Sequence, residues 1–174
     1  MEPLIRYPIL QHAFVVADID EGCRYWTRAV GAGPFFVARH HRGDRHTHRG
    51  EPFRADVSYA FGQCGATHIQ LIQQHDDAPS VYRELFAPGE AGFHHVAVLV
   101  PEADLPGEKA RFEAAGFAVA SELWSIADVA YIDTRSALGG FVELHGDNEE
   151  IRGVFDRFRV AHEQWDGTTR PIRG

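Results

Sequence analysis

An approximate internal repeat is the feature of this sequence that most constrains its fold. An apolar stretch headed by a histidine occurs as Gln11-His12-Ala13-Phe14-Val15 and again as His94-His95-Val96-Ala97-Val98. Each copy is followed by a helical pattern that ends at a glycine, Gly33 in the first half and Gly116 in the second. Repetition of this kind indicates a duplicated supersecondary unit. We therefore expect two similar modules that share one core.

Hydrophobic periodicity predicts the order strand, helix and three strands (βαβββ) in each module. In the first, Asp18 or Asp20 can cap the helix, and the last two strands form a hairpin. The strands are expected at residues 10–17, 35–38, 57–61 and 67–73, with a polar loop at 39–54. In the second module the helix is expected at 107–115 and the strands at 95–100, 117–121, 129–133 and 141–145.

The remaining segments connect or follow the modules. A short helix is predicted at 80–86, and a longer one at 149–164 before a loose tail. The predicted domain organisation is a first module at 1–78, a linker helix at 79–92, a second module at 93–148, and a C-terminal helix and tail at 149–174. The apolar stripe of the C-terminal helix either covers one module or forms a homodimer contact.

Composition excludes several classes of function. The formal net charge of −8 argues against a nucleic-acid partner, which would require a basic surface. No apolar run reaches the roughly 20 residues that span a bilayer, and no signal peptide is evident. Two cysteines are too few for a disulfide framework. We expect a cytoplasmic protein without a membrane partner.

Four polar residues occupy matching places in the two modules: His12, Gln70, His95 and Glu143. Gln70 and Glu143 each lie between aliphatic residues that point the other way. Two imidazoles, an amide oxygen and a carboxylate suit a divalent ion such as Zn, Co, Ni, Mn or Fe(II). The alternative for each residue is a hydrogen-bonded core histidine or a strand residue that faces solvent.

The motifs Q-H-A-F-V-V, H-I-Q-L-I-Q, G-F-H-H-V-A-V and F-V-E-L-H, at residues 8–147, resemble the vicinal oxygen chelate superfamily (glyoxalase, bleomycin-resistance and dioxygenase proteins). Within it, the chain is most similar to methylmalonyl-CoA epimerase-like members. The resemblance implies an α+β fold in which paired βαβββ modules form a half-open, barrel-like sheet around a metal cleft. It also implies an isomerase or lyase that removes a proton beside a metal-bound oxygen of a small carbonyl, carboxylate or acyl-CoA substrate.

The residue that moves the proton is less clearly indicated. Related epimerases carry a Pro-Glu pair before the strand at 57–61, where this chain has Phe53-Arg54. The main candidates for acid–base catalysis are Glu143, His68, Tyr59 and Glu51. His145, on the same strand face as Glu143, and Asp56, near Glu51, are further candidates. Each of them is equally well explained as polar lining of the cleft.

The segment 39–54 is basic within an acidic protein. Its arginines predict a clamp for a substrate carboxylate or CoA phosphates, the alternative being a solvated loop. The candidate residues are Arg39, Arg42, Arg49 and Arg54. The same segment offers a less favoured second metal site from His40, His41, His46 and His48.

Two other functions are compatible with the sequence. An Fe(II) ring-cleaving dioxygenase would use His12, His95 and Glu143 as a facial triad, although Gln70 would take a position that oxygen needs. A metal-free protein that binds a drug-like or aromatic ligand in the cleft is the third possibility. Metal analysis of untagged protein distinguishes this third function from the two enzymes.

Overall fold

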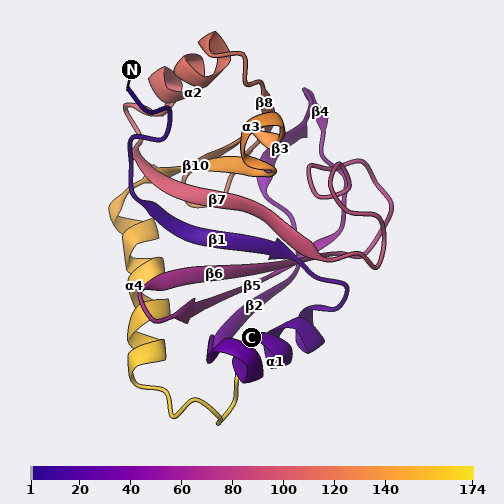
Figure 1. Cartoon of the computed structure of the whole chain (residues 1–174), viewed down its shortest axis with the longest axis vertical. Helices are drawn as coiled ribbons and strands as arrows, with labels where there is room; N and C mark the ends of the chain where they lie inside the picture. Colours follow the sequence, from indigo (N-terminus) through magenta and orange to yellow (C-terminus); the bar gives the residue numbers. More distant parts are fainter. Residues whose placement is uncertain (1) are drawn as a thin grey trace.

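The computed structural model describes residues 2–174, whose strands form one curved, unclosed sheet in the order β11-β2-β5-β6-β1-β7-β10-β9-β8-β3-β4 (Figure 1). The strands are β1 (Ile9–Val15), β2 (Phe35–His41), β3 (Asp44–His48), β4 (Glu51–Pro52), β5 (Val57–Cys64), β6 (Thr67–Gln74), β7 (Gly92–Pro101), β8 (Val119–Trp124), β9 (Asp128–Ile132), β10 (Phe141–Asp147) and β11 (Ile172–Arg173). The helices are α1 (Ile19–Val30), α2 (Leu105–Ala114), α3 (Arg135–Leu138) and α4 (Glu149–Glu163).

The two βαβββ modules meet at the centre of the sheet. β1 pairs antiparallel with β7 and so joins the modules, while β6 and β10 run parallel to β1 and β7 on their other sides. This places the first and last strands of each module side by side. The paired arrangement and the α+β class are therefore confirmed. No helix within residues 2–174 combines the length and apolarity that crossing a bilayer requires.

Alternation along the strands separates an outer face from an inner face. α1 packs outside the first module on Ile69 and Leu71, and α2 packs outside the second module on Val142 and Leu144. Asp18 caps α1, accepting a hydrogen bond from the backbone N–H of Glu21 at 2.8 Å. The alternate residues of the same strands therefore line the concave inner face.

The segment 39–54 differs from the polar loop expected there. β2 extends to His41, and after two intervening residues β3 begins against β8, at the opposite end of the sheet. The chain crosses there through Gly43, where a Cβ atom would lie 2.8 Å from a methyl carbon of Leu123. A side chain at this position would displace Leu123, and the close approach brings the two ends of the sheet together over the inner face.

Two other segments also differ from expectation. Residues 81–85 form turns rather than a helix, and they place Val81 and Tyr82 in the inner core. The tail is not loose, because β11 pairs with β2 at Phe35 and Phe36. The C-terminal helix covers apolar surface: Phe158 of α4 stacks on the ring of Phe61.

A cluster of ion pairs holds the segment 39–54, which crosses between the two ends of the sheet, against the second module. Arg49 donates to both Glu84 carboxylate oxygens, at 2.9 and 2.6 Å, and to Asp133 at 2.6 Å. Arg135 contacts the same two carboxylates, each at 2.7 Å, and His48 contacts Glu84 at 2.7 Å. Arg49 is therefore committed to holding the fold.

The substitution Arg49→Met is expected to lower the free energy of unfolding by about 1 kcal/mol, allowing for solvent screening of a side chain that is 35% exposed. Hydrogen bonds from Arg135 and Arg49 hold the pKa of Asp133 below its ordinary value. This stabilisation is present above the ordinary carboxyl pKa and is lost as the pH falls through the lowered one. Urea unfolding at neutral pH and in strong acid should therefore show the effect only at neutral pH. The control Arg45→Met, which breaks an exposed pair with Asp128, should change stability little.

Candidate functional site

The register of β1 places Gln11, and not His12, on the inner face. Gln11 is 2% exposed and shares this face with Ala13 and Val15. His12 is half-buried on the outer face, paired in register with Ile69 and Val96. The expectation that His12 joins the cleft residues is wrong by one residue, since a shift of one along a strand reverses the side-chain direction.

Gln11 completes a cluster with three of the residues expected at the centre, Gln70, His95 and Glu143. The Gln11 amide nitrogen lies 3.0 Å from Gln70 Oε1 and 3.4 Å from His95 Nε2. His95 Nε2 lies 3.0 Å from Glu143 Oε2. All four side chains are buried and come from β1, β6, β7 and β10, the four strands at the junction of the modules.

A chain of hydrogen bonds determines which nitrogen of His95 carries a proton. The carbonyl of Val81 can only accept, so His94 Nε2, at 3.2 Å from it, donates. Burial lowers the pKa of His94 well below its ordinary value, so this ring is neutral and its Nδ1 has a lone pair. His95 Nδ1, 2.7 Å away, must donate to that lone pair.

In a neutral His95 ring, Nε2 therefore presents a lone pair to the Glu143 carboxylate. Lone pairs 3.0 Å apart repel unless a proton or a cation lies between them. Burial alone would raise the pKa of Glu143, but the hydrogen bond and charge of His95 outweigh it and lower that pKa. The His95–Glu143 pair is therefore arranged to hold a proton or a metal ion between His95 Nε2 and the carboxylate.

His68 controls the orientation of the Gln11 amide. Its Nδ1 lies 2.7 Å from Gln11 Oε1, whereas its Nε2 is buried without a hydrogen-bond partner among the described residues. Desolvation lowers the pKa of His68 to about 3, so the ring is neutral. If the Gln11 amide turns over, its oxygen faces His95 and Gln70, and its NH₂ group donates to His68 Nδ1.

The donor set fits a divalent cation once Gln11 has turned in this way. It then offers one imidazole nitrogen, one carboxylate and two amide oxygens, all facing one another. His95 donates its other ring N–H to His94, the kind of outer support that metal-binding histidines require. With a single imidazole, the set is richer in oxygen than the expected one, which favours Mn²⁺ over softer ions.

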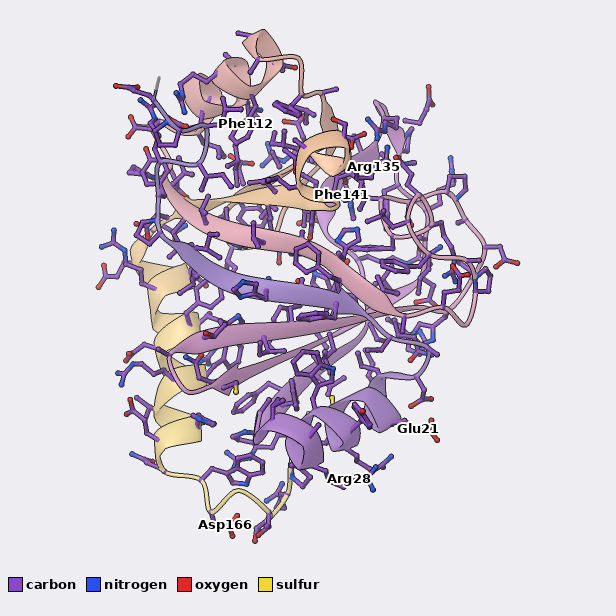
Figure 2. All side chains as sticks on the ribbon, in the orientation of Figure 1. Glu21, Arg28, Phe112, Arg135, Phe141 and Asp166 are labelled. Atoms are coloured by element: carbon purple, nitrogen blue, oxygen red, sulfur yellow. The ribbon has the colours of Figure 1, made fainter. Side chains whose placement is uncertain are left out.

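Aromatic residues pack around this centre. Tyr131 is the cross-strand neighbour of Glu143 and packs edge-on against Tyr82, whose hydroxyl lies 2.9 Å from that of Tyr59. Burial raises the pKa of Tyr59 well above its ordinary value, so Tyr59 is a hydrogen-bonding group and not a base. On the other side Phe141 stacks on His94, with the Arg135 guanidinium 5.1 Å from its ring centre (Figure 2).

A cavity of about 180 Å³ opens beside the cluster. Its lining includes Gln11, Gln70 and Glu143 on one side and Phe155 and Phe158 of α4 on the other. The volume corresponds to about six liquid waters, so a small acyl or oxo-acid group fits and a nucleotide does not. α4 runs along one side of the sheet in Figure 1 and supplies one wall of this half-open cavity, called the chamber below.

Three further imidazoles line this chamber: His41, His46 and His145. His145 Nδ1 donates to the Gly146 carbonyl at 3.0 Å, so in the neutral ring Nε2 is free to accept a proton. Desolvation, followed by the neighbouring histidines, lowers the pKa of His46 to about 4, and the ring stacks on Phe53.

Other expected site residues lie apart from the chamber. Glu51 is exposed on β4 at the edge of the sheet, and Arg39 pairs with Asp20 on the outer side. Arg54 is exposed, and Arg42 is exposed between two residues that line the chamber. Neither arginine has a carboxylate partner within residues 2–174.

The second metal site expected within 39–54 does not form from its four histidines. His40 contacts Asp56, His48 contacts Glu84, and His41 and His46 line the chamber. Sequence reasoning also missed Gln11, His94, Tyr82 and Tyr131. Only Gln11 and His94 had a signal, since each directly precedes a histidine that was singled out.

The chain is similar to known proteins both in sequence and in fold. Residues 10–131 match the sequence model of the Glyoxalase/Bleomycin resistance protein/Dioxygenase superfamily, whereas no curated protein sequence matches the chain. Methylmalonyl-CoA epimerase from Mycobacterium tuberculosis is similar in structure, with a TM-score of 0.56 and 17% identity over 88% of this chain and 95% of that one. A hypothetical protein from Bacillus halodurans gives 0.58 and 16% over 83% and 96%. A Streptomyces coelicolor methylmalonyl-CoA epimerase variant in complex with 2-nitronate-propionyl-CoA gives 0.54 and 16% over 82% and 96%.

Proposed function

We propose that this chain, which belongs to the glyoxalase/bleomycin resistance protein/dioxygenase superfamily, is a metal-dependent isomerase or lyase that removes a proton next to a carbonyl group. The observation that carries the proposal is the 3.0 Å approach of His95 Nε2 to the Glu143 carboxylate within a cluster of four buried polar side chains. Either a proton or a metal ion between the two groups would stabilise this arrangement. The ion would be held by Gln11, Gln70, His95 and Glu143.

The bound ion would supply Lewis-acid polarisation of a substrate carbonyl. Residues of the chain would accept the proton, exclude water and position the ligands. His145 Nε2 accepts the proton, because its Nδ1–H is fixed on the Gly146 carbonyl and its ring faces the chamber. Phe155 and Phe158 exclude water, which strengthens every charge interaction inside. Tyr131 packs beside Glu143 as its cross-strand neighbour on β9.

The proposed substrate is a small 2-oxo acid or the acyl end of a CoA thioester. The chamber volume limits the reacting part to a few heavy atoms, so any larger group must lie outside it. Arg42, exposed at the rim between His41 and Gly43, is then the arginine available for a phosphate or carboxylate. The solved epimerases that share the fold point to the thioester first.

The test is deuterium incorporation at the carbon next to the carbonyl, followed by NMR in D₂O with methylmalonyl-CoA and a series of 2-oxo acids. We expect exchange after reconstitution with Mn²⁺ or Co²⁺ and a loss of at least about 100-fold after chelation. Equal exchange before and after chelation would contradict the metal requirement. Oxygen uptake with catechols would favour the dioxygenase, and tight binding of an aromatic ligand without metal would favour a binding protein.

The role of His145 has its own test. The substitution His145→Gln is expected to lower kcat by about 100-fold or more while leaving Mn²⁺ affinity unchanged. The matched control is His12→Gln, which removes an imidazole from the outer face of β1. If both variants behaved alike, His145 would not be the base.

A further inference from the structure

A second polar cluster lies on the outer face of the first module, where β2 and β6 end beside the start of β5. It contains His40, Asp56 and His75, each of which offers a ligand atom within 4.8 Å of the other two. His40 Nδ1 lies 2.9 Å from both carboxylate oxygens of Asp56. The rings of His40 and His75 are 4.6 Å apart between centres.

A β-bulge directs His40 into this cluster. Ala38 pairs with Tyr59 and His41 pairs with Val57, so Arg39 and His40 together oppose the single residue Ser58. His40 adopts a φ of +50°, a conformation that L residues rarely take. The extra residue lets Ala38 and His41 both line the chamber while His40 faces outward.

Ser58 and the local backbone hold the other two residues in place. Ser58 Oγ accepts from the His40 backbone N–H at 3.1 Å and lies 2.7 Å from His75 Nε2. The backbone N–H of His75 donates to the Asp56 carbonyl at 2.8 Å. The neighbouring carboxylate of Asp76 accepts hydrogen bonds from the Asp56 N–H, the Gln74 amide and the Ala78 N–H. These hydrogen bonds therefore hold His40, Asp56 and His75 in position.

We propose that His40, Asp56 and His75 form a surface site for a divalent transition-metal ion of the zinc type, separate from the cluster in the chamber. Two imidazoles and one carboxylate are a donor set that Zn²⁺ accepts, with water as the fourth ligand. The ion takes the place of the proton that now joins His40 to Asp56. Imidazole-rich donors distinguish this site from the oxygen-rich chamber.

Occupancy of the site ties β2, β5 and β6 together. An ion that binds only the folded state stabilises it by mass action. Because His41 directly follows His40, the same ion also fixes the bulge that directs His41 to the chamber. At a Zn²⁺ concentration of about 100 times Kd, we expect Tm to rise by roughly 5 °C or more.

The experiment titrates Zn²⁺ into the full untagged chain in competition with a chromophoric chelator, and follows Tm. The background variant is Glu143→Gln, which removes the carboxylate of the chamber site and leaves the surface site intact. We expect this variant to bind one equivalent of Zn²⁺. Adding His75→Ala should weaken that binding by about tenfold or more and reduce the Tm shift at the same Zn²⁺ concentration to about half or less.

Two further variants complete the design. Asp56→Asn keeps the shape of the side chain, removes its charge and should weaken binding to a similar extent. His12→Ala removes a histidine outside the cluster and should leave binding unchanged. The proposal is overturned if Glu143→Gln binds no Zn²⁺, or if His75→Ala and His12→Ala bind equally well in that background. Neither outcome bears on proton exchange in the chamber.

Discussion

Replacing Glu143 with glutamine is expected to remove cation binding from the chamber and, with it, at least about 100-fold of the proton-exchange rate. The substitution keeps the size of the side chain and its contact with Tyr131. It removes the charge that faces His95 Nε2 at 3.0 Å. Calorimetric titration with Mn²⁺ and the deuterium assay measure the two losses together.

The same variant should change the response of stability to pH. The folded-state pKa of Glu143 is lowered, so its ionised form stabilises the fold above the ordinary carboxyl pKa. This contribution is lost as the pH falls through the lowered value. Glu143→Gln should therefore unfold with less dependence on acidification than the unmodified chain.

The matched variant Gln11→His should act in the opposite direction. It places a second imidazole beside His95, Gln70 and Glu143, where Gln11 now offers only an amide. Affinity for Co²⁺ or Zn²⁺ should rise by about tenfold or more, because imidazole is the better ligand for these ions. A Gln11→His protein with unchanged affinity, or a Glu143→Gln protein that still bound metal in the chamber, would contradict the four-residue site.

The error at His12 shows how far sequence alone could go. The duplication and the last strands of both modules were readable, so the sequence could predict that Gln70, His95 and Glu143 lie close together. The first strand is apolar on both faces, since α1 covers one side and the inner core the other. The alternation of apolar and polar residues therefore could not show whether Gln11 or His12 faces the inner side of the sheet. Aligning Ala13 with Ala97, both buried on the inner face, would have selected Gln11.

Other features depend on contacts between distant segments. The strands within 39–54 form only because β8, far along the chain, offers an edge to β3. Arg49 looked free to bind a substrate anion, yet Glu84 and Asp133 approach it in the folded chain. Neither pairing leaves a local signal in the sequence. The chemistry of single residues was predictable, while their partners were not.

Shortening Phe158 to alanine is expected to have the largest effect on stability, a loss of about 3 kcal/mol. Phe158 is 7% exposed and packs on Phe36, Phe61 and His68, with ring centres 5.1, 5.8 and 5.4 Å away. Removing the ring opens the chamber between α4 and β5. Urea unfolding measures the loss, and the deuterium assay should show relatively faster exchange with bulkier acyl groups.

The state of His68 gives this prediction a second readout. Its Nε2 has no partner in the described chain and lies among aromatic rings, so burial lowers the pKa of His68 to about 3. Water that enters in place of the Phe158 ring can donate to Nε2 and hydrate the ring. NMR titration should then find the pKa of His68 closer to the ordinary histidine value. The control Arg157→Ala, on the exposed side of α4, should leave both that pKa and stability unchanged. An unshifted His68 in the Phe158→Ala protein would mean that α4 closes over the gap, and the helix would not be the wall that excludes water.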